Sequence, residues 1–586
     1  MTARGAGAGF GVPGSGECNV SKWIFADVWE TVADTLPDAP ALAQGDRTLT
    51  WSEFDHRADH LARWLLEAGV DRQDKVALYL YNCPEYLEAT LACFKIALVP
   101  INTNYRYADD ELLYLWDNAD TVTVVFHGAF VDRIERIRSR LPDIRSWLWV
   151  DDGTGPCPIW AVPYEAIASG SGAPRQHGAL TRGGVGRDGS GSPPGTGRVT
   201  APWGRSPDDL YMLYTGGTTG LPKGVMWRQD DLFALLNGAG FRRYPENGGP
   251  ADVRGELERS GRGMTLLPAC PLMHGTGGFT ALECLCEGGR VVTLASRTFD
   301  PEELLDTVVR EQVNGLIIVG DVFAKPILAA LDAHPGRWDL TSLVGIISSG
   351  VMWSEETKEG LLRHYPGMLL VDAFSSSEAI GMGTSVSSGT DSARTARFVL
   401  GPEVRVLDPD GRDVEPGSGR SGVLALGGRI PVGYYKDEAK TSATFRTIDG
   451  VRYSVPGDYA EVGADGSIHL LGRGSVVINT GGEKVYPEEV EEAIKTLDGV
   501  ADAVVVGLPN DRFGEEIVAV VEPTAGTDPG SLSADAVIEH VKGRLAGYKA
   551  PRRVHVVDTI GRSPAGKVDY ARHLAETAEW AGVPMG

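Results

Sequence analysis

The sequence predicts an α/β protein in which a large N-terminal part is followed by a small α+β unit. Three observations lead to this fold class. Apolar runs of strand length alternate with stretches of helical period from Trp23 to about Leu370, as in layered α/β folds with largely parallel sheets. Short strands and turns then dominate from Val404 to Leu471. After Arg473, roughly 110 residues form a further set of helices and strands, long enough to be a domain.

The first α/β stretch begins at Trp23, after a Gly/Ala-rich start that we interpret as a flexible tail over residues 1–22. Helical stretches repeat an apolar residue every three or four positions, whereas strands are short β-branched or aromatic runs. Helical spacing covers 24–29, 54–66 and 84–95, and the expected strands are 75–80 and 122–126.

The second α/β stretch begins near Leu210, and its apolar runs at 316–319 and 344–347 indicate buried strands. Turn residues then separate short strands such as 404–407 and 422–426, which predicts a small β-barrel or sheet. In the C-terminal unit, we expect helices at 487–497 and 534–545, and strands at 503–506, 517–521 and 554–557.

A Gly-, Ser-, Pro- and Arg-rich segment, Ser169–Arg198, interrupts the first part of the chain. It has hardly an apolar side chain to bury, so we expect a disordered surface insertion. Within it, Gly184–Gly189 matches the GxGxxG pattern of dinucleotide-binding folds. That pattern binds a dinucleotide only between a strand and a helix, and neither is predicted here, so we assign no Rossmann site.

The composition excludes several classes of protein. The chain has 586 residues and a formal net charge of −24, which opposes a nucleic-acid-binding surface. No apolar run approaches the roughly 18 residues of a membrane span, so we expect no integral membrane association. The start of the chain also lacks the apolar core of a secretory signal. The seven cysteines include no CxxC pair, which favours a reducing, cytoplasmic compartment over a disulfide framework.

The most informative stretch is Tyr214–Val225, with the sequence YTGGTTGLPKGV. Its glycines let the backbone approach a ligand closely, its threonines add hydroxyl donors and Lys223 adds a positive charge, a combination that suits phosphate. It is not a Walker A loop, because Gly220 and Lys223 are not adjacent and no Ser or Thr follows the lysine. The residues expected to contact the phosphates are Thr215, Gly216, Gly217, Thr218, Thr219, Gly220 and Lys223.

This stretch resembles the phosphate loop of adenylate-forming enzymes, which include acyl-CoA synthetases, nonribosomal adenylation domains and luciferases. The resemblance extends from about Trp23 to Tyr570, without the insertion, and is strongest to acyl-CoA synthetases that act on fatty or steroid-derived acids. It implies an N-terminal adenylation domain over 23–472, composed of two α/β subdomains and a small β-barrel. A hinge at Gly474-Ser475 would join it to a mobile C-terminal domain over 473–586.

A second motif, Asp372–Glu378, occupies the place of the family's aromatic-Gly-x-Thr-Glu motif. By this resemblance, Phe374 stacks on adenine, Ser377 contacts the α-phosphate and Glu378 holds Mg²⁺, a hard cation that prefers carboxylate and phosphate oxygens. Ser375 replaces a glycine and adds a side chain where the acyl group enters. The nucleotide-binding residues that the resemblance implies here are Ser349, Gly350, Asp372, Phe374, Ser377 and Glu378.

Later motifs complete the nucleotide site by the same resemblance. Asp458, in a Gly-Asp element, accepts hydrogen bonds from the two ribose hydroxyls. Arg473, at the domain junction, contacts the ribose or a phosphate. Lys567, in a C-terminal Pro-x-Gly-Lys motif, is the expected catalytic lysine that reaches the substrate carboxylate and the α-phosphate.

The resemblance also implies where CoA and the acid bind. A loop with Gly481, Gly482 and Lys484 would swing in for the second half-reaction and line the CoA tunnel. His274 would order the substrate carboxylate or shape the tunnel, and a satisfied core histidine is an equally good interpretation. The candidates for the acyl pocket are Trp227, His274, Phe279, Val322, Phe323 and Ser375. The candidate catalytic residues are Thr215, His274, Glu378 and Lys567.

The first hypothesis is therefore an ATP-dependent carboxylic acid–CoA ligase, which activates an acid as acyl-AMP with Mg²⁺-ATP and transfers it to CoA. The alternative is an adenylate-forming enzyme that does not use CoA; it would transfer the acyl group to an amine or carrier protein, or activate nitrite for diazotisation. A non-catalytic nucleotide-binding protein is the third hypothesis, and the joint presence of the motif residues opposes it. The expected partners are a small-molecule carboxylic acid, ATP and CoA, with a homodimer as a possible assembly.

Overall fold

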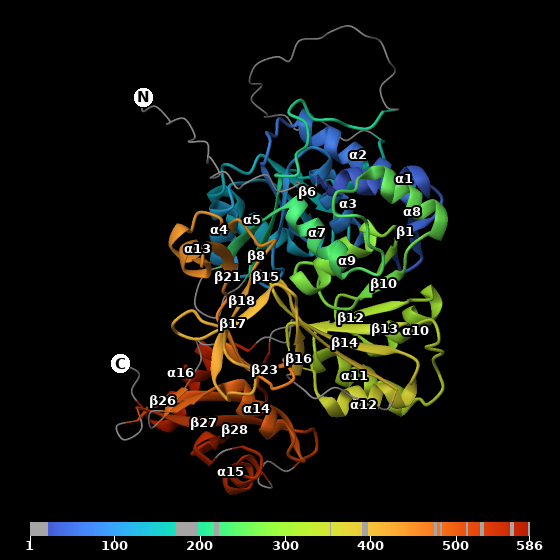
Figure 1. The fold of residues 1–586 in the computed structure, drawn as a ribbon. Helices are drawn as coiled ribbons and strands as arrows, with labels where there is room; N and C mark the ends of the chain where they lie inside the picture. Colours follow the sequence, from blue (N-terminus) through green and yellow to red (C-terminus); the bar gives the residue numbers. More distant parts are fainter. Residues whose placement is uncertain are drawn as a thin grey trace, which may run out of the picture.

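The fold combines two large β-sheets with a third, smaller sheet in a C-terminal unit (Figure 1). The predicted tail and most of the predicted insertion, including its GxGxxG match, lie outside the residues that the structure describes. The computed structural model describes residues 22–171, 197–215, 222–351, 353–389, 397–473, 478–480, 483–510, 514–527, 532–545, 547–562 and 568–583.

An eight-stranded sheet has the order β19-β9-β8-β4-β3-β5-β6-β7. Strands β8 to β7 in this order are parallel, whereas β9 and β19 extend the edge with antiparallel pairing. The strands predicted at 75–80 and 122–126 are confirmed as β3 and β5. The bounds are β3 (Lys75–Tyr79), β4 (Val99–Asn102), β5 (Thr121–His127), β6 (Ser146–Val150), β7 (Val162–Pro163), β8 (Leu210–Thr215), β9 (Lys223–Arg228) and β19 (Gly433–Tyr434).

Helices cover both faces of this sheet, which parallel strands require because both of their faces are apolar. α4 and α5 pack on one face, and α1, α2 and α3 belong to the larger core on the other. The helix predicted at 84–95 is confirmed as α3, and the helical spacing at 24–29 and 54–66 lies within α1 and α2. The bounds are α1 (Phe25–Thr35), α2 (Trp51–Glu67), α3 (Pro84–Lys95), α4 (Asp109–Asn118), α5 (Val131–Ile137) and α6 (Tyr164–Ala168).

A 15-stranded sheet runs along the path β2-β1-β11-β10-β12-β13-β14-β15-β16-β23-β22-β18-β21-β20, and β17 pairs with β18. The strands predicted at 316–319 and 344–347 are confirmed as its parallel strands β12 and β13. The short strands predicted between 404 and 471 are also present, and β16 joins them to β15. The bounds are β1 (Pro40–Gln44), β2 (Arg47–Thr50), β10 (Thr265–Pro268), β11 (Arg290–Thr293), β12 (Gly315–Ile318), β13 (Gly345–Ser349), β14 (Leu369–Ser376), β15 (Ala379–Ser388), β16 (Arg397–Leu400), β17 (Val404–Leu407), β18 (Ser421–Leu426), β20 (Phe445–Ile448), β21 (Val451–Ser454), β22 (Asp458–Val462) and β23 (Ile468–Arg473).

Helices α9 to α12 lie along the parallel half of this second sheet, and α9 lies between the two sheets (Figure 1). Helix α7 packs on α9 and β9, and α8 packs on α1. No helix within the described ranges is both long and apolar enough to cross a membrane. Cys284 and Cys286 are buried in α9. The bounds are α7 (Gln229–Ala239), α8 (Pro250–Ser260), α9 (Gly275–Cys286), α10 (Pro301–Glu311), α11 (Asp321–Ala333), α12 (Glu355–His364) and α13 (Glu438–Thr444).

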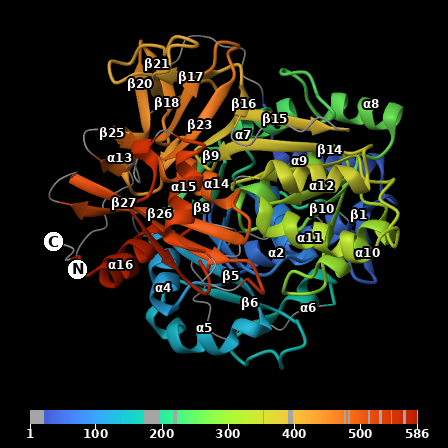
Figure 2. The ribbon, with the colours of Figure 1, turned by 90° about the horizontal axis from the view of Figure 1, so that it is seen from below.

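The C-terminal unit lies on the underside of the N-terminal part and faces the viewer in Figure 2. Its five-stranded sheet, β25-β24-β27-β26 with β28 paired to β27, has its own apolar clusters. The predicted α+β unit is thus confirmed, with one addition: helix α16, which packs on β26, was not predicted. The bounds are β24 (Ile478–Thr480), β25 (Glu483–Val485), β26 (Val500–Asn510), β27 (Gly514–Pro523), β28 (Arg553–Val556), α14 (Pro487–Lys495), α15 (Ala534–Lys542) and α16 (Tyr570–Ala581).

A fully buried lysine ties the first helices together. The ammonium of Lys95, in α3, lies 2.9 Å from Glu30 in α1 and 2.7 and 2.9 Å from Asp55 and Asp59 in α2. A buried charge is tolerated only when it is paired and hydrogen-bonded, because leaving it alone carries a large desolvation penalty. The three carboxylates therefore fix how α1, α2 and α3 pack.

The predicted insertion is shorter than the composition suggested. Arg198, which the sequence assigned to the disordered segment, forms ion pairs with Asp34 at 2.8 Å and with Asp55 at 3.4 Å. Arginine is common in flexible surface segments, but here acidic side chains of α1 and α2 hold its guanidinium in place. The described chain resumes at Gly197, so the boundary at Arg198 was wrong.

The two ends of the undescribed segment lie beside the same turn of α2. His60 contacts the carbonyl oxygen of Ala168 at 3.0 Å, and Arg63 donates to the carbonyl oxygen of Gly197 at 3.2 Å. Residues three apart on a helix are neighbours, about 5–6 Å between Cβ atoms. The chain therefore leaves and re-enters the fold at nearly the same place.

We predict that residues 172–196 can be replaced by a short Gly-Ser linker without loss of the fold. Because the ends are close, the shorter loop closes with little change in chain entropy, and the melting temperature should stay within about 3 °C. Differential scanning calorimetry measures it. As a comparison, Arg198→Ala removes a real contact and should lower the melting temperature; insoluble protein after the 172–196 replacement would contradict the prediction.

Candidate functional site

The β8–β9 hairpin carries the ends of the predicted phosphate loop. Thr215 and Lys223 face each other as the last pair of this antiparallel ladder. The residues between them, including Gly216, Gly217, Thr218, Thr219 and Gly220, lie outside the described residues. The ammonium of Lys223 lies 2.7 Å from the carboxylate of Asp437 and 6.0 Å from the ring centre of Tyr434. The hairpin thus presents a positive charge beside the loop, held by one carboxylate.

Tyr434 connects this hairpin to Glu378. Its strand, β19, pairs with β9 so that Tyr434 lies opposite Val225. The Tyr434 hydroxyl donates to Oε1 of the buried Glu378 at 2.8 Å. Lys223, Tyr434, Asp437 and Glu378 are therefore brought together from segments more than 50 residues apart. The sequence predicted Lys223 of the phosphate loop and Glu378 of the second motif as site residues. It did not predict Asp437 and Tyr434, the side chains that contact them.

The β13 and β14 strands bring the predicted nucleotide residues side by side. Ser349 pairs with Ala373, between Asp372 and Phe374, in a parallel register. Gly350 follows with φ of 95°, a left-handed conformation that glycine adopts without strain. A Cβ at Gly350 would lie 3.7 Å from the hydroxyl of Thr276 in α9. These contacts show that the ends of β13 and β14 lie against the first turn of α9.

Two of the three serines in the second motif, Ser375 and Ser377, are held by hydrogen bonds. The indole N–H of Trp227, on β9, donates to the carbonyl oxygen of Ser377 at 3.0 Å. The hydroxyl of Ser375 accepts from the N–H of Gly381 at 2.9 Å, closing the turn between β14 and β15. The ring of Phe374 lies 5.6 Å from that of Phe398 on β16. Trp227 is fully buried, so it supports the motif from behind.

Asp372 forms a buried ion pair rather than an open carboxylate. Its Oδ2 lies 2.7 Å from the ammonium of Lys358, and both side chains are nearly inaccessible to solvent. Burial raises the pKa of Asp372 to about 6; Lys358 opposes the shift, and the negative charges of Asp321 and Glu492 add to it. Glu492 belongs to α14, so a charge of the C-terminal unit acts on a residue of β14.

The junction between the two parts of the chain depends on Gly472. Asp458 is buried at the start of β22 and pairs across the strands with Arg473. Gly472 has φ of 103°, and a Cβ there would overlap the carboxylate of Glu488 in α14. Because its φ is positive, a residue with a side chain at position 472 would be strained, and the carboxylate of Glu488 would have to move. Lys567, Gly481 and Gly482 lie outside the described residues, and Lys484 lies on β25.

The acyl-pocket candidates do not form one group. His274 is the N-cap residue of α9 and Phe279 is buried one turn later, so these two share a helix end. Val322 and Phe323 begin α11 instead. Phe323 is buried with its ring 4.9 Å from that of Phe299, whereas Val322 is exposed. Both helix starts lie against the end of β13: Thr276 of α9 donates to the carbonyl oxygen of Ser349 at 3.4 Å, and the N–H of Gly320, before α11, donates to Ser348 Oγ at 2.9 Å.

Asn102 is a site residue that the sequence did not reveal. Its side-chain amide donates to the carbonyl oxygens of Tyr214 at 2.8 Å and Met273 at 2.7 Å, and accepts from the N–H of Tyr214 at 2.6 Å. It therefore fixes the end of β8 against the segment that leads into His274. Lys358, Tyr434 and Asp437 were missed for the same reason: their partners are distant in sequence, and no local pattern marks them.

The residues around Glu378 fit a magnesium ion held with a nucleotide. Tyr434 occupies one carboxylate oxygen of Glu378. Within the described residues, no group of three or more His, Cys, Asp or Glu side chains could hold a metal ion by itself. Mg²⁺ is usually held by one or two carboxylates together with substrate phosphates and water. A single carboxylate beside a phosphate loop matches that mode.

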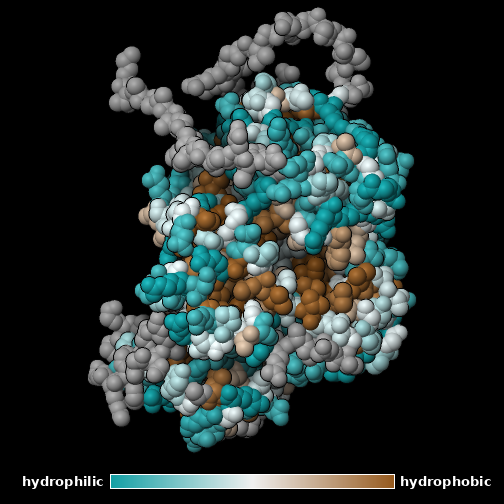
Figure 3. All heavy atoms as spheres, in the orientation of Figure 1, coloured by the Kyte–Doolittle hydropathy of each residue, from teal (hydrophilic) through white to brown (hydrophobic). Residues whose placement is uncertain are grey.

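Hydrophobic side chains gather across the middle of the face shown in Figure 3, at the level where β12 and β18 lie in Figure 1. The rest of this face is mainly hydrophilic, in keeping with the acidic composition. Large exposed apolar patches usually mark sites that bind ligands or partners. The distribution therefore suits an apolar ligand rather than a highly charged one alone.

Comparison with known protein families and structures identifies the family of the chain. The family model described as "AMP-binding enzyme" matches residues 29–435, and that described as "AMP-binding enzyme C-terminal domain" matches residues 489–567. A medium/long-chain-fatty-acid–CoA/3-oxocholest-4-en-26-oate–CoA ligase of Mycolicibacterium smegmatis is 41% identical over 93% of this chain and 95% of its own length. A 3-oxocholest-4-en-26-oate–CoA ligase of Rhodococcus rhodochrous is 39% identical over 93% of this chain and 94% of its own.

Solved structures show the same fold. The anthranilate CoA ligase AuaEII in complex with anthranoyl-AMP superposes with a TM-score of 0.76 at 18% identity, covering 96% of this chain and 98% of its own. The amide bond synthetase McbA from Marinactinospora thermotolerans gives a TM-score of 0.73 at 22% identity, covering 94% and 99%. Both comparisons support a large N-terminal domain with a small C-terminal domain.

Glu283, in the last turn of α9, has a shifted pKa that links the stability of the protein to pH. Burial raises the pKa of Glu283 to about 8, and the like charge of Glu287 adds to the shift. The folded protein therefore keeps a proton on Glu283 that the unfolded chain loses near its ordinary value of 4.5, so stability should fall as the pH rises from about 4.5 to 8.

We predict that Glu283→Gln removes this pH dependence. The melting temperature of the variant should exceed that of the wild type at pH 8 and approach or fall below it at pH 5, with a change in the difference of roughly 2–4 °C or more. Thermal unfolding across this pH range measures the effect. Glu258→Gln, at an exposed position of α8, is the control; a pH-independent difference for Glu283→Gln would refute the buried acid.

Proposed function

Because the chain belongs to the AMP-binding enzyme family, we propose that it is an ATP-dependent carboxylic acid–CoA ligase. The observation that carries the proposal is the network of Lys223, Asp437, Tyr434 and Glu378 at the mouth of the phosphate loop. In this proposal, the ammonium of Lys223 binds a nucleotide's phosphates and the carboxylate of Glu378 binds their metal ion. The relatives, about 40% identical over most of the chain, carry the names of acid–CoA ligases.

The reaction needs positioning and charge neutralisation more than covalent chemistry by the protein. A carboxylate oxygen of the acid attacks the α-phosphorus of ATP, and the bond from that phosphorus to the bridging oxygen breaks with loss of pyrophosphate. The sulfur of CoA then attacks the carbonyl carbon of the acyl-adenylate. The bond to the phosphate oxygen breaks, AMP leaves and the thiol proton passes to solvent.

The chain's own residues have distinct parts in the first step. Lys223 neutralises phosphate charge, with Thr215 and the loop glycines as hydrogen-bond donors. Asp437 orients Lys223 and must release or share it when phosphates bind. Glu378, oriented by Tyr434, would hold Mg²⁺, which neutralises phosphate charge and favours pyrophosphate as the leaving group. Lys567 would reach the carboxylate and α-phosphate from the C-terminal domain.

The nucleoside end of ATP would lie along β13 and β14. Phe374 would offer its ring to adenine beside Ser349 and Gly350, and Ser377 would contact the α-phosphate. Asp458 and Arg473 would bind the ribose. Asp372 has a different part in this proposal: since it is paired with Lys358, it stabilises β14 rather than contacting ATP directly.

The substrate is a medium- or long-chain fatty acid or a steroid-derived acid. The names of the relatives support this class, and so does the apolar band in Figure 3. His274 would lie nearest the carboxylate, and Phe279 would contact the first part of the acyl body. Trp227, Val322, Phe323 and Ser375 remain candidates on other elements.

The second half-reaction would use the C-terminal domain over 473–586. Described contacts between it and the rest of the chain include Lys325 with the carbonyl oxygen of Ala501 at 3.4 Å and Tyr486 with Ser421 at 3.4 Å. Polar contacts of this length are weak, which suits a domain that rotates. Gly481, Gly482 and Lys484 would then line the CoA tunnel. We propose cytoplasmic action and a homodimer as the assembly to test.

The direct test measures AMP release from ATP and Mg²⁺ with fatty, steroid-derived and aromatic acids. We expect AMP and an acyl-CoA of the right mass only when the acid, ATP and CoA are all present, with apolar acids preferred over aromatic ones. Each acid is run with CoA, without CoA and with nitrite instead of CoA, and mass spectrometry identifies the products. AMP release that is equal with and without CoA would contradict the proposal and indicate an adenylate-forming enzyme that does not use CoA.

We predict that Glu378→Gln lowers kcat/KM for acyl-adenylate formation by about 100-fold or more, because a neutral amide stabilises a divalent ion far less than a carboxylate. Pyrophosphate release measures the step, and the Mg²⁺ concentration at half-maximal rate should rise. Glu438→Gln changes an exposed glutamate beside Asp437 and serves as the matched control. If the wild type and Glu378→Gln depend on Mg²⁺ concentration in the same way, Glu378 does not bind the metal ion.

A further inference from the structure

Two asparagines lie at neighbouring strand ends, on the edge of the eight-stranded sheet that carries the phosphate loop. Asn102 is the last residue of β4, and Asn82 follows the end of β3 by three positions. Strands β3, β4 and β8 are parallel, so their carboxyl ends lie at the same edge as Thr215. Parallel sheets bind their ligands beyond this edge. Both asparagines are therefore placed beside the candidate site.

Asn82 holds the segment 268–273, which leads from the end of β10 to His274. Its amide nitrogen donates to the carbonyl oxygens of Cys270 at 3.0 Å and Pro268 at 3.3 Å, and its amide oxygen accepts from the N–H of Leu272 at 2.7 Å. Because β10 belongs to the second sheet, one side chain of the first sheet fixes three backbone groups of the second.

Asn102 holds the far end of the segment 268–273 and, with the same amide, the end of β8. It bonds to the carbonyl oxygen of Met273 and to both backbone groups of Tyr214. Met273 precedes His274, and Tyr214 precedes Thr215. One side chain thus binds the immediate neighbours of two candidate catalytic residues.

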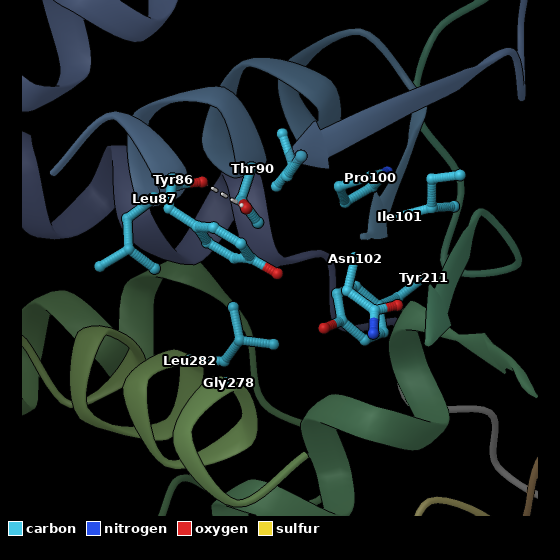
Figure 4. Close-up of a pocket in the computed structure, with 10 residues that line it drawn as sticks. Tyr86, Leu87, Thr90, Pro100, Ile101, Asn102, Tyr211, Gly278 and Leu282 are labelled. Carbon is cyan, nitrogen blue, oxygen red and sulfur yellow. Dashed lines mark hydrogen bonds between the residues drawn. The ribbon is translucent and has the colours of Figure 1, made fainter. Parts of the chain in front are cut away.

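The hydrogen bonds of these side chains require a primary amide. Each amide donates through its nitrogen to two carbonyl oxygens and accepts one N–H, whereas a carboxylate offers no donor. Asn102 is 6% exposed, and Figure 4 shows it next to Tyr211 beside a cavity of about 10 Å³, close to the space of one water molecule. Little room remains for solvent to replace its bonds.

The first turn of α9 lies directly against the segment 268–273. A Cβ at Gly277 would lie 2.5 Å from the carbonyl oxygen of Pro271, and a Cβ at Gly278 would lie 2.8 Å from that of Leu272. Only glycine permits so close an approach of backbone to backbone. The N–H of His274 donates to the carbonyl oxygen of Pro271 at 3.1 Å. The position of His274 therefore depends on the segment that the two asparagines hold.

We propose that Asn82 and Asn102 are positioning residues for adenylation, which together set the distance between the carboxylate of the acid and the α-phosphate of ATP. This role rests on the proposed function, which places the carboxylate at His274 and the phosphates at Thr215. The attacking oxygen must lie about 3–3.5 Å from phosphorus, and a misplacement of about 1 Å can lower the rate about 100-fold. Each asparagine acts through the backbone that it binds and contacts neither substrate.

The two asparagines should differ in their effects on the two substrates. Among the described residues, the side-chain amide of Asn82 bonds only to the segment 268–273, so Asn82→Ala should raise the KM of the acid about tenfold and leave that of ATP within about twofold. Asn102 also holds β8, so Asn102→Ala should lower kcat about 100-fold and raise both KM values. Pyrophosphate release with dodecanoate and ATP measures these constants.

A double-mutant cycle tests whether Asn82 acts through His274. In a His274→Ala background, Asn82→Ala should change kcat/KM for the acid by less than about twofold, because the side chain that it positions has been removed. Asn102→Ala should keep its effect on the KM of ATP in that background, since it also holds Tyr214.

Asn314→Ala is the matched control. The amide of Asn314 accepts from the N–H of Thr265 at 2.9 Å and donates to the carbonyl oxygen of Ser342 at 3.1 Å. Thr265 begins β10, at the end of the strand remote from the segment 268–273. The control should lose about as much melting temperature as Asn82→Ala, with kcat and both KM values unchanged. If Asn102→Ala does not fold, Asn102→Asp keeps the side-chain volume, removes the donors and should change the same constants.

Two results would overturn the inference: kinetic changes in Asn314→Ala equal to those in Asn82→Ala, or a full effect of Asn82→Ala without His274. Failure of the proposed function appears differently, as absence of AMP in the wild type. Calorimetry with dodecanoate and with a non-hydrolysable ATP analogue then still decides on the asparagines. Asn82→Ala should weaken binding of the acid alone and Asn102→Ala that of both ligands, whereas unchanged binding in both variants, or a wild type that binds neither ligand, would refute their role.

Discussion

The antiparallel pairing of β8 with β9 is the interaction on which the candidate site depends. It places Thr215 opposite Lys223 at the two ends of the phosphate loop. The outer edge of β9 pairs with β19, which carries Tyr434 to Glu378 and leads to Asp437 beside Lys223. The inner face of β8 directs Tyr211 and Leu213 toward α9. One hairpin thus sets the position of Lys223 at the phosphate loop and of the Glu378 carboxylate beside it.

Buried ion pairs hold the elements around that hairpin in fixed positions. Lys95 with its three carboxylates fixes α1, α2 and α3, and Lys358 with Asp372 fixes α12 against β14. Such pairs gain little net stability over apolar residues, but breaking one leaves a buried charge and is strongly destabilising. They therefore act mainly by penalising alternative packings. The nearby charge of Glu492 on Asp372 extends this coupling to the C-terminal unit.

The sequence predicted what depends on local pattern. Helix α3 and strands β12 and β13 were located because an apolar period alone determines them. What depends on distant partners was not predicted. Arg198 has the composition of the insertion, yet its partner Asp34 lies 164 positions away. Tyr434, Asp437 and Asn102 are likewise ordinary residues in the sequence, and only the packing of β19 and β4 around β8 gives them their contacts.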